Sequence, residues 1–302
     1  DPGEPPAAMI AFGSAITDGA MYERCAEPGI LLAAEPDSLI LPTQTTGSLY
    51  RNYNLMFDLA AEHDDLEALV LVHQDAELVD PNFCSVVREA FADPEVALGG
   101  LAGSLGVRSI AWWEAAVTWA SFSHRYTEYG GGEVESISFI AEKTPHFEQT
   151  GVVDSVDGFV MVFSPWAVRN LRFDENLGNL HGYDFDICCQ VREAGRKVVT
   201  LNTRAVHHHS LQLVSNVETW IEAHVQLTEK WEGRLPGVGA GGDDWKKRAR
   251  YAEASASAAK TLAASDALKR EAVTEEIARM RETLSWRITR PLRWLGNLLK
   301  KG

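Results

Sequence analysis

The stretch LVLVHQDAEL, Leu69 to Leu78, changes abruptly from apolar to polar. Its four leading aliphatic residues are typical of a strand that is buried on both faces of a parallel sheet. In an open parallel sheet the crevice that binds ligands lies beyond the carboxyl ends of the strands. The sequence therefore predicts that His73-Gln74-Asp75 lies at a ligand-binding edge. The alternative for Asp75 alone is a solvated turn.

The flanking sequence alternates between strand and helix patterns. Before this stretch we expect strands at Met9–Ser14 and Gly29–Ala34, then an amphipathic helix over residues 48–62. After it we expect the following elements: a helix over 82–91, a strand within 94–104, a strand and a helix within 156–171, a helix ending at Gly195 and a strand over 196–202. This alternation predicts an α/β fold with a mainly parallel sheet.

Composition places the chain among globular proteins. It has 302 residues, of which 45% are hydrophobic and 24% charged, enough for one large α/β domain with appendages. No apolar run approaches the roughly 18 to 20 residues of a membrane span, and the first residues lack the basic region of a secretory signal. The four cysteines have no CxxC spacing, so a reducing cytoplasm is the expected compartment.

Charge is distributed unevenly. The net charge of −15 argues against nucleic acid as a partner. Residues 285–302 nevertheless hold five basic residues, two tryptophans and several leucines without any acid. This amphipathic, cationic tail predicts binding to an anionic membrane surface, at the inner face of the cell membrane. The alternative is a helix that packs on its own protein or on a partner subunit.

Other polar residues are expected at the same edge of the sheet as Asp75. Asp184 and Asp186 follow Gly182 at a predicted helix start, and His207-His208-His209 follow the last predicted strand. Several such groups at one edge favour a functional site over a set of unrelated turns.

The ordered set LVLVHQDAEL, VDGFVMVFSPWAV, LRFDENL, GYDFDICCQVREAGRKVV and VHHHS resembles the inverting family 2 glycosyltransferases of the GT-A fold, and most of all a bacterial branch with HQD in place of DxD. The resemblance covers roughly Met9 to Ser210. A second likeness lies in TLSWRITRPLRWLG, which is similar to the tail of bacterial cell-surface polysaccharide and rhamnosyl transferases. The family resemblance implies a Rossmann-like nucleotide-diphospho-sugar transferase fold, here with a helical C-terminal extension.

The resemblance implies a divalent cation that neutralises the diphosphate of the donor. Asp75 would be one ligand and His209 another, with His208 as the rival, and such a mixed site suits Mn²⁺ or Mg²⁺. His73 stands where the family has its first acid, so we expect it to pack or to hydrogen-bond at the donor ribose instead of binding the metal as a carboxylate would. The alternative for the three histidines is a polar loop.

For the catalytic base, the resemblance points to Asp184, with Tyr183 at a position where an acid is usual. Asp186 is the second candidate. Two residues apart at a helix start, the two acids would point in different directions, so one of them at most reaches a given proton. The alternative is that both merely stabilise the helix N-terminus.

Donor and acceptor contacts are also implied. The predicted donor-binding residues are Ser14, Glu35, Arg51, Asn54, His73, Gln74 and Asp75. Arg51 and Asn54 have the alternative of being exposed helix residues. On the acceptor side we expect Asp157 and Gly158 to line the cleft and Trp112 and Trp113 to stack on sugar rings, although paired tryptophans are also common core or loop anchors.

These observations predict a GT-A domain over residues 1–235, a Gly-rich linker over 236–245, a long helix over 246–284 and the basic tail over 285–302. The expected activity is inverting, metal-dependent transfer from a UDP- or dTDP-sugar to a cell-surface glycan or lipid-linked acceptor. The long helix, with Val273, Ile277, Met280 and Leu284 at steps of four and three, also suggests a homo-oligomer. Two alternatives stay open: a catalytically idle scaffold of a polysaccharide assembly complex, and a nucleotidyltransferase, although the sequence has no GxxxxGK[ST] loop.

Overall fold

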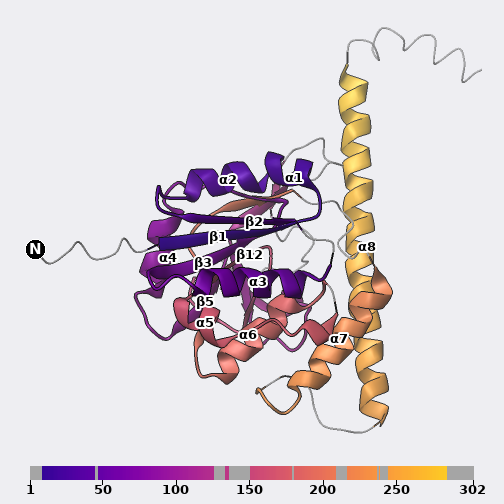
Figure 1. Ribbon diagram of the computed structural model, residues 1–302. Helices are drawn as coiled ribbons and strands as arrows, with labels where there is room; N and C mark the ends of the chain where they lie inside the picture. Colours follow the sequence, from indigo (N-terminus) through magenta and orange to yellow (C-terminus); the bar gives the residue numbers. More distant parts are fainter. Residues whose placement is uncertain are drawn as a thin grey trace, which may run out of the picture.

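A seven-stranded sheet forms the centre of the protein, here described from a computed structural model (Figure 1). The structure describes residues 9–44, 47–125, 133–135, 150–178, 180–208, 216–236, 238 and 244–283, with the backbone alone for 133–135 and 244–249. In sheet order the strands are β10 (Val152–Val153), β13 (Lys197–Thr200), β5 (Val96–Gly100), β12 (Val160–Phe163), β3 (Leu66–Val72), β1 (Met9–Ile16) and β2 (Leu39–Gln44).

Five of these strands run in one direction. β1 is parallel to β2 and β3, β13 is parallel to β5, and β12 is antiparallel to both β3 and β5. β10 is antiparallel to β13 at the edge. The predicted α/β fold with a mainly parallel sheet is therefore confirmed.

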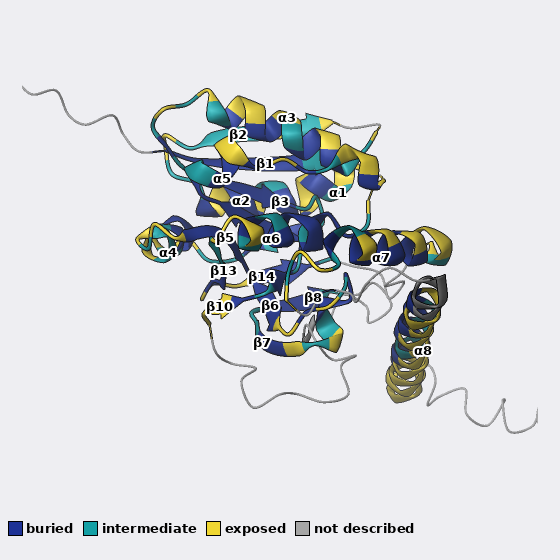
Figure 2. Ribbon diagram, turned by 90° about the horizontal axis from the view of Figure 1, so that it is seen from below, coloured by how far each residue is buried: buried dark blue, intermediate teal, exposed yellow. Residues whose placement is uncertain are grey.

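Helices cover both faces of the sheet (Figure 1). α1 (Gly19–Arg24), α2 (Ala26–Ala33) and α4 (Phe83–Phe91) lie on one face, and α3 (Leu49–Ala61), α5 (Pro165–Asn170) and α6 (Tyr183–Glu193) lie on the other. Figure 2 shows the inner strands between them as buried, whereas the edge strand β2 is partly exposed. Leu69, Val70, Leu71 and Val72 of β3 are fully buried, because a strand covered on both faces has no solvent side.

The helix predicted over residues 48–62 is confirmed as α3. Its buried apolar residues, Tyr50, Tyr53, Met56, Phe57 and Ala60, recur at steps of three and four and form one apolar face. The structure likewise has helices close to the other predicted ones, at α4, α5 and α6. The left-handed backbone of Gly195, at φ +71°, follows the end of α6.

The strand predicted at Gly29–Ala34 is wrong, because these residues belong to helix α2 and the turn after it. Leu31 and Leu32 are exposed at 66% and 48%, so the apolar run is not a buried strand. The second strand is instead β2, at the edge of the sheet. It contains Pro42, which an edge strand tolerates because one side of the strand needs no hydrogen-bonded partner.

Two smaller sheets flank the central one. One comprises β4 (Ala76–Leu78), β14 (Ala205–His207), β8 (Phe122–Arg125) and β9 (Glu133–Glu135), and the other β11 (Ser155–Val156), β6 (Ala102–Leu105) and β7 (Ala116–Ala120). The predicted strand within 94–104 is thus two strands, β5 and β6, in different sheets. Two short 3-10 helices lie at Trp112–Glu114 and Glu175–Leu177. Because β4 follows β3 after three residues, it places the turn at 73–75 between the central sheet and the sheet of β14.

The C-terminal part of the described chain is helical. α7 (Val217–Trp231) packs against α8 (Asp244–Glu282), which stands beside the α/β body (Figure 1). The predicted helical extension is confirmed, whereas the domain boundaries remain predictions and residues 284–302, with the predicted tail, lie outside the described residues. Val273, Ile277 and Met280 near the end of α8 are exposed. Within the described residues, the helices contain no stretch long and apolar enough to span a membrane.

All four cysteines are free thiols inside the protein. They are Cys25, Cys84, Cys188 and Cys189. The Cys84 thiol donates to the carbonyl of Ala33 over 3.2 Å and so connects α4 to α2.

Candidate active site

His73-Gln74-Asp75 forms a tight turn directly after β3. The His73 amide donates to the Phe159 carbonyl over 2.9 Å, and the Ala76 amide donates to the His73 carbonyl over 3.0 Å. The Gln74 side chain oxygen accepts the amides of Thr17 and Asp18 at 2.8 and 2.9 Å. Gln74 thereby fixes the loop that leaves β1.

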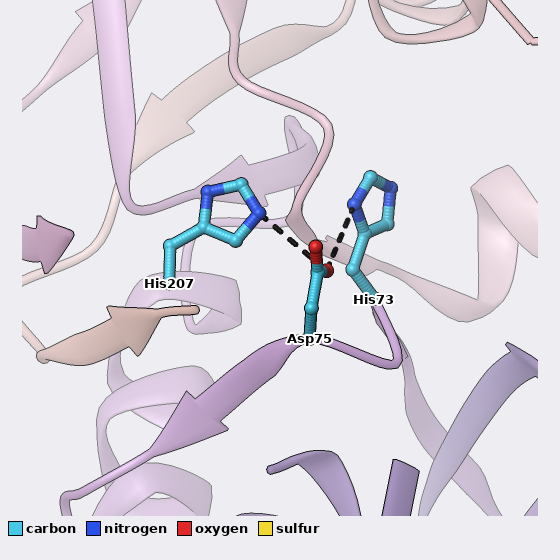
Figure 3. A group of neighbouring side chains, drawn as sticks. All are labelled: His73, Asp75 and His207. Carbon is cyan, nitrogen blue, oxygen red and sulfur yellow. Dashed lines mark ion pairs between the residues drawn. The ribbon is translucent and has the colours of Figure 1, made fainter. Parts of the chain in front are cut away.

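His207 reaches Asp75 because β4 and β14 pair antiparallel with His207 opposite Ala76. His207 Nε2 lies 3.5 Å from Asp75 Oδ1, and His73 Nδ1 lies 3.8 Å from the same oxygen (Figure 3). The His207 ring stacks on Phe159, with centroids 5.0 Å apart, and its side chain is 10% exposed. Burial lowers the pKa of His207, but the negative charges of Asp75 and Asp157 outweigh that effect and raise it.

These three side chains fit a divalent cation. One potential ligand atom from each of His73, Asp75 and His207 lies within 4.8 Å of the others. Two atoms that bind one ion at about 2.1 Å lie roughly 3.0 to 3.6 Å apart at angles of 90° to 120°. The separations of 3.5 and 3.8 Å are close to that range and too long for strong hydrogen bonds. Two imidazoles and one carboxylate suit Mn²⁺ better than Mg²⁺, which prefers oxygen ligands.

His208 lies on the other side of β14. Its Nε2 is 2.7 Å from Glu77 Oε2, and its amide donates to the Asp75 carbonyl over 2.7 Å. His209 lies outside the described residues. Of the histidines in this run that the structure describes, His207 is therefore the one whose ring reaches Asp75.

Asp184 lies in the first turn of α6, behind Gly182, whose left-handed backbone (φ +80°) starts the helix. Its carboxylate accepts the amides of Gly158 at 3.2 Å and Phe185 at 2.8 Å. Burial and the negative charge of Asp157 raise the pKa of Asp184 to about 7. A carboxyl group with such a pKa can exchange a proton near neutral pH.

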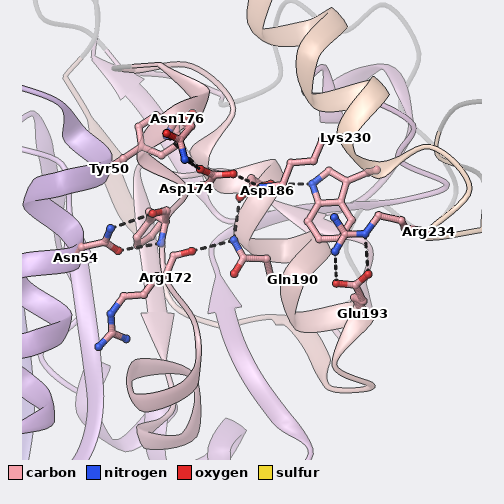
Figure 4. A network of polar contacts seen from close by, with 12 residues as sticks. Tyr50, Asn54, Arg172, Asp174, Asn176, Asp186, Gln190, Glu193, Lys230 and Arg234 are labelled. Carbon is pink, nitrogen blue, oxygen red and sulfur yellow. Dashed lines mark hydrogen bonds and ion pairs between the residues drawn. The ribbon is translucent and has the colours of Figure 1, made fainter.

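Asp186 points into the protein and is 1% exposed. It accepts hydrogen bonds from Trp231 Nε1 at 2.7 Å and Gln190 Nε2 at 2.8 Å, and it pairs with Lys230 Nζ at 2.8 Å (Figure 4). The two acids of this turn thus diverge, as expected from their spacing. Asp186 joins α6 to α7, and Asp184 stays near the strand ends.

Tyr183 connects α6 to the turn after β3. Its hydroxyl lies 2.5 Å from His73 Nε2 and its side chain is 6% exposed. A methyl group on Gly158 would lie 2.3 Å from the same hydroxyl, so the absence of a side chain there leaves room for the tyrosine.

The remaining predicted donor residues lie at different places. Ser14 donates to the Val72 carbonyl over 2.8 Å, at the carboxyl ends of β1 and β3. Asn54 exchanges two hydrogen bonds with the backbone of Phe173, and Arg51 is exposed on α3. Glu35 follows α2 and not a strand. Its partner Arg88 also binds Glu67 in the second residue of β3, so the structure places Glu35 at the opposite end of the sheet from Asp75.

The predicted acceptor residues gather around Asp157. Trp112 is 4% exposed and donates its indole N–H to Asp157 Oδ2 over 3.1 Å, so its ring packs inside the protein. Trp113 is half-buried against Trp220, with ring centroids 6.4 Å apart. Asp157 and Gly158 lie beside Asp184, because the Gly158 amide binds the Asp184 carboxylate.

Sequence reasoning missed two features of this site. It gave no role to His207 or to Tyr183. Alternation of side chains along a strand separates neighbouring histidines onto opposite sides, but it does not tell which of them faces Asp75. The contact between Tyr183 and His73 had no local signal, since the residues are 110 positions apart.

Fold and site together define an α/β protein with a histidine–carboxylate cluster and an acid of raised pKa at the carboxyl end of its sheet. The model of the glycosyltransferase-like family matches residues 12–230, and the chain belongs to that family. The streptomycin biosynthesis protein StrF of Streptomyces griseus is 29% identical over 208 residues, which cover 67% of each chain.

Two solved structures are similar to the chain at low identity. The mannosyltransferase PcManGT from Pyrobaculum calidifontis, in complex with GDP-Man and Mn²⁺, is 15% identical with a TM-score of 0.44, over 93% of this chain and 82% of that one. GalNAc-T7 with UDP, GalNAc and Mn²⁺ is 8% identical with a TM-score of 0.45, over 83% of this chain and 55% of that one.

Proposed function

We propose that the protein is an inverting, metal-dependent glycosyltransferase of the GT-A fold that uses a UDP- or dTDP-sugar. The observation that carries this proposal is the meeting of two groups at one end of the sheet. One is the cluster of Asp75 with His73 and His207, and the other is Asp184, with a pKa of about 7. Membership in the glycosyltransferase-like family supports the reaction class.

Asp75, His207 and His73 would hold the cation. Bound there, a divalent cation neutralises charge that develops on the diphosphate of the donor. This assignment adds His207 and sets aside His208, which binds Glu77, while the role of His209 stays a prediction. Imidazole ligands beside the carboxylate make Mn²⁺ the first choice.

Asp184 is the proposed base. Its carboxylate takes the proton of the acceptor hydroxyl as that oxygen forms a bond to the anomeric carbon of the donor sugar. The bond between the anomeric carbon and the phosphate oxygen breaks, and the nucleoside diphosphate leaves with the electron pair. Asp186 is a poor alternative, because its two oxygens already bind Trp231, Lys230 and Gln190.

We propose the donor site around the loop after β1, which Gln74 holds at Thr17 and Asp18. Ser14 lies just before that loop and connects β1 to β3 by its hydrogen bond to the Val72 carbonyl. The acceptor would enter from the side of Asp157 and Gly158. Trp112 then serves by orienting Asp157 through its indole N–H rather than by stacking on a sugar.

The acceptor is proposed to be a cell-surface glycan or a lipid-linked sugar. In this proposal the basic tail at 285–302 brings the enzyme to an anionic membrane, and the exposed Val273, Ile277 and Met280 of α8 contribute to a homo-oligomer. Liposome co-sedimentation of the full chain and of a truncation after Thr283, across a salt series, tests the tail. Equal sedimentation of both forms contradicts the membrane role.

A donor-hydrolysis screen over nucleotide sugars, with and without Mn²⁺, tests the function itself. We expect Mn²⁺-dependent release of UDP or dTDP by the native chain and a large loss in Asp184→Asn. Asp58→Asn is the matched control, because Asp58 is an exposed acid of α3 that pairs with Arg172. Hydrolysis of nucleoside triphosphates instead would indicate a nucleotidyltransferase, and no turnover of any donor would indicate a scaffold.

A further inference from the structure

Tyr183 is the residue through which helix α6 contacts the cation cluster. Its hydroxyl is 2.5 Å from His73 Nε2, whereas the other ring nitrogen, Nδ1, is 3.8 Å from Asp75 Oδ1. A distance of 3.8 Å is too long for a hydrogen bond, and 2.5 Å is a short one. The hydrogen-bonding contact of the His73 ring with these two residues is thus made at Nε2, on the side that faces away from Asp75.

A neutral imidazole has one N–H and one lone pair, and a tyrosine hydroxyl can accept from the first or donate to the second. A cation at Nδ1 takes the lone pair there, which leaves the proton on Nε2. We propose that Tyr183 is a positioning residue: its hydroxyl oxygen accepts the Nε2–H of His73 and so keeps the Nδ1 lone pair directed at the cation site. This inference rests on the proposed metal dependence, in which His73 is a ligand beside Asp75 and His207.

The position of the Tyr183 hydroxyl is fixed by packing. The ring is surrounded by aromatic neighbours at centroid distances of 5.7 Å for Tyr53, 6.1 Å for Tyr50 and 6.2 Å for Phe173. Gly158 closes the remaining side, since even a Cβ atom there would lie 2.3 Å from the hydroxyl. A partner held in this way restricts the orientation of the His73 ring as well as its tautomer.

The chemistry of the partner also matters. A tyrosine hydroxyl is neutral at pH 7, so it can accept a hydrogen bond from His73 without favouring the doubly protonated imidazolium. A carboxylate in the same place would raise the basicity of the imidazole more strongly, and metal-binding histidines are commonly held by either a carboxylate or a neutral oxygen. Tyr183 therefore keeps His73 both oriented and competent as a ligand.

Mn²⁺ titration followed by electron paramagnetic resonance tests the inference. We expect Tyr183→Phe to weaken Mn²⁺ binding about 10-fold, the lower end for loss of a group that orients a metal ligand, and Asp75→Asn to abolish it. Tyr53→Phe is the matched control. It makes the same chemical change in the same aromatic cluster, on a buried hydroxyl that has no hydrogen bond within the described part of the chain, and it should bind Mn²⁺ within twofold of the native protein.

The tautomer of His73 gives a second readout, which a merely structural role would not change. In long-range ¹H–¹⁵N spectra of the metal-free native protein, assigned by loss of the signal in His73→Gln, we expect the proton on Nε2. A proton on Nδ1 overturns the inference, and this measurement does not require that Tyr183→Phe folds. Thermal unfolding of Tyr183→Phe and Tyr53→Phe without metal compares the folding of the two variants.

The outcomes separate the two proposals. One outcome is that Tyr183→Phe binds Mn²⁺ as tightly as the native protein, while Asp75→Asn does not bind it. In that case the positioning role is wrong and the metal site stands. If the native protein itself binds no Mn²⁺, with or without UDP, the metal-dependent mechanism fails and the role of Tyr183 fails with it.

Discussion

The two ends of strand β3 carry charged side chains in opposite arrangements. At the amino end, Arg88 binds Glu67 at 2.6 Å and Glu35 at 2.6 and 2.7 Å. At the carboxyl end, Asp75 lies 3.5 and 3.8 Å from two imidazole nitrogens, and the Asp184 carboxyl has a pKa of about 7, raised by burial and by Asp157.

At the amino end, Glu35 and Glu67 both lie at ion-pair distance from Arg88. The same holds for Lys197 at the start of β13, which pairs with Asp93 at 2.8 Å and Glu95 at 2.6 Å. Such pairs stabilise the fold modestly. At the carboxyl end, by contrast, Asp75 is placed to bind a cation and Asp184 to bind a proton. Acids in such environments are typical of a site that acts on a ligand.

The largest effect is expected at Asp75. Asp75→Ala should abolish Mn²⁺-dependent binding of UDP or dTDP, because it removes the carboxylate that both imidazoles approach. Calorimetric titration of each nucleotide with and without Mn²⁺ measures this. Undiminished Mn²⁺-dependent binding in the variant would refute the assignment.

Asp184→Asn should keep donor binding and lower transfer by about 10² or more, the usual contribution of a general base. In the native enzyme kcat/KM should rise with pH through about 7, since the base acts in its carboxylate form. The variant should lose this rise. If Asp186→Asn is the inactive variant and Asp184→Asn turns over normally, the roles are reversed.

The raised pKa of Asp184 also affects stability, with a definite sign. The folded state holds this proton up to about pH 7, whereas an unfolded aspartate loses it near 3.8, so folding loses stability as the pH rises between these values. Asp184→Asn removes that loss. Its Tm should therefore exceed the native value more at pH 8 than at pH 4, and equal differences at both pH values would contradict the assigned environment.

Asp186→Asn should mainly affect folding. It leaves the Lys230 ammonium without one of its two acids in a buried network, and the free energy of unfolding should fall by about 3 kcal/mol. Urea denaturation measures this loss. Transfer by the folded variant should stay within a few-fold of the native rate, and a loss near that of Asp184→Asn would give Asp186 a direct role.

The smallest effect is expected at the amino end. Arg88→Met should lower the free energy of unfolding by about 1 kcal/mol, because the ion pairs of Arg88 are partly exposed. Its kcat and KM should not change by more than about twofold, since the site lies at the other end of β3. A large loss of activity without a change in stability would contradict a purely structural role for the amino end of β3.

Much of the fold follows from local sequence patterns. The apolar run before His73 correctly predicted a buried strand with a polar turn at its end, and the spacing in α3 predicted its buried face. The run Gly29–Ala34 misled because a short apolar segment has no periodicity that separates strand from helix. Strand β2 was missed because an edge strand with mixed burial and a proline lacks the pattern of a buried one.

The sequence predicted which segments contribute residues to the site, but it did not predict which side chains touch one another. Chain topology indicated that Asp75, Asp184 and the histidines would meet at one edge. Which histidine faces Asp75 depends on the pairing of β4 with β14, and the contact of Tyr183 with His73 depends on how α6 packs. Both are decided by long-range packing, which residue spacing does not encode.

The burial of the four cysteines makes the native chain a poor target for thiol reagents. Burial raises the pKa of Cys84 to about 11 and that of Cys188 to about 12, and Cys25 and Cys189 are buried as well, so the reactive thiolate is scarce at neutral pH. A single cysteine introduced at the exposed Leu31 of α2 or Met280 of α8 would react far faster than any of the four. The protein can therefore carry one spectroscopic label on either helix with all of its own thiols left in place.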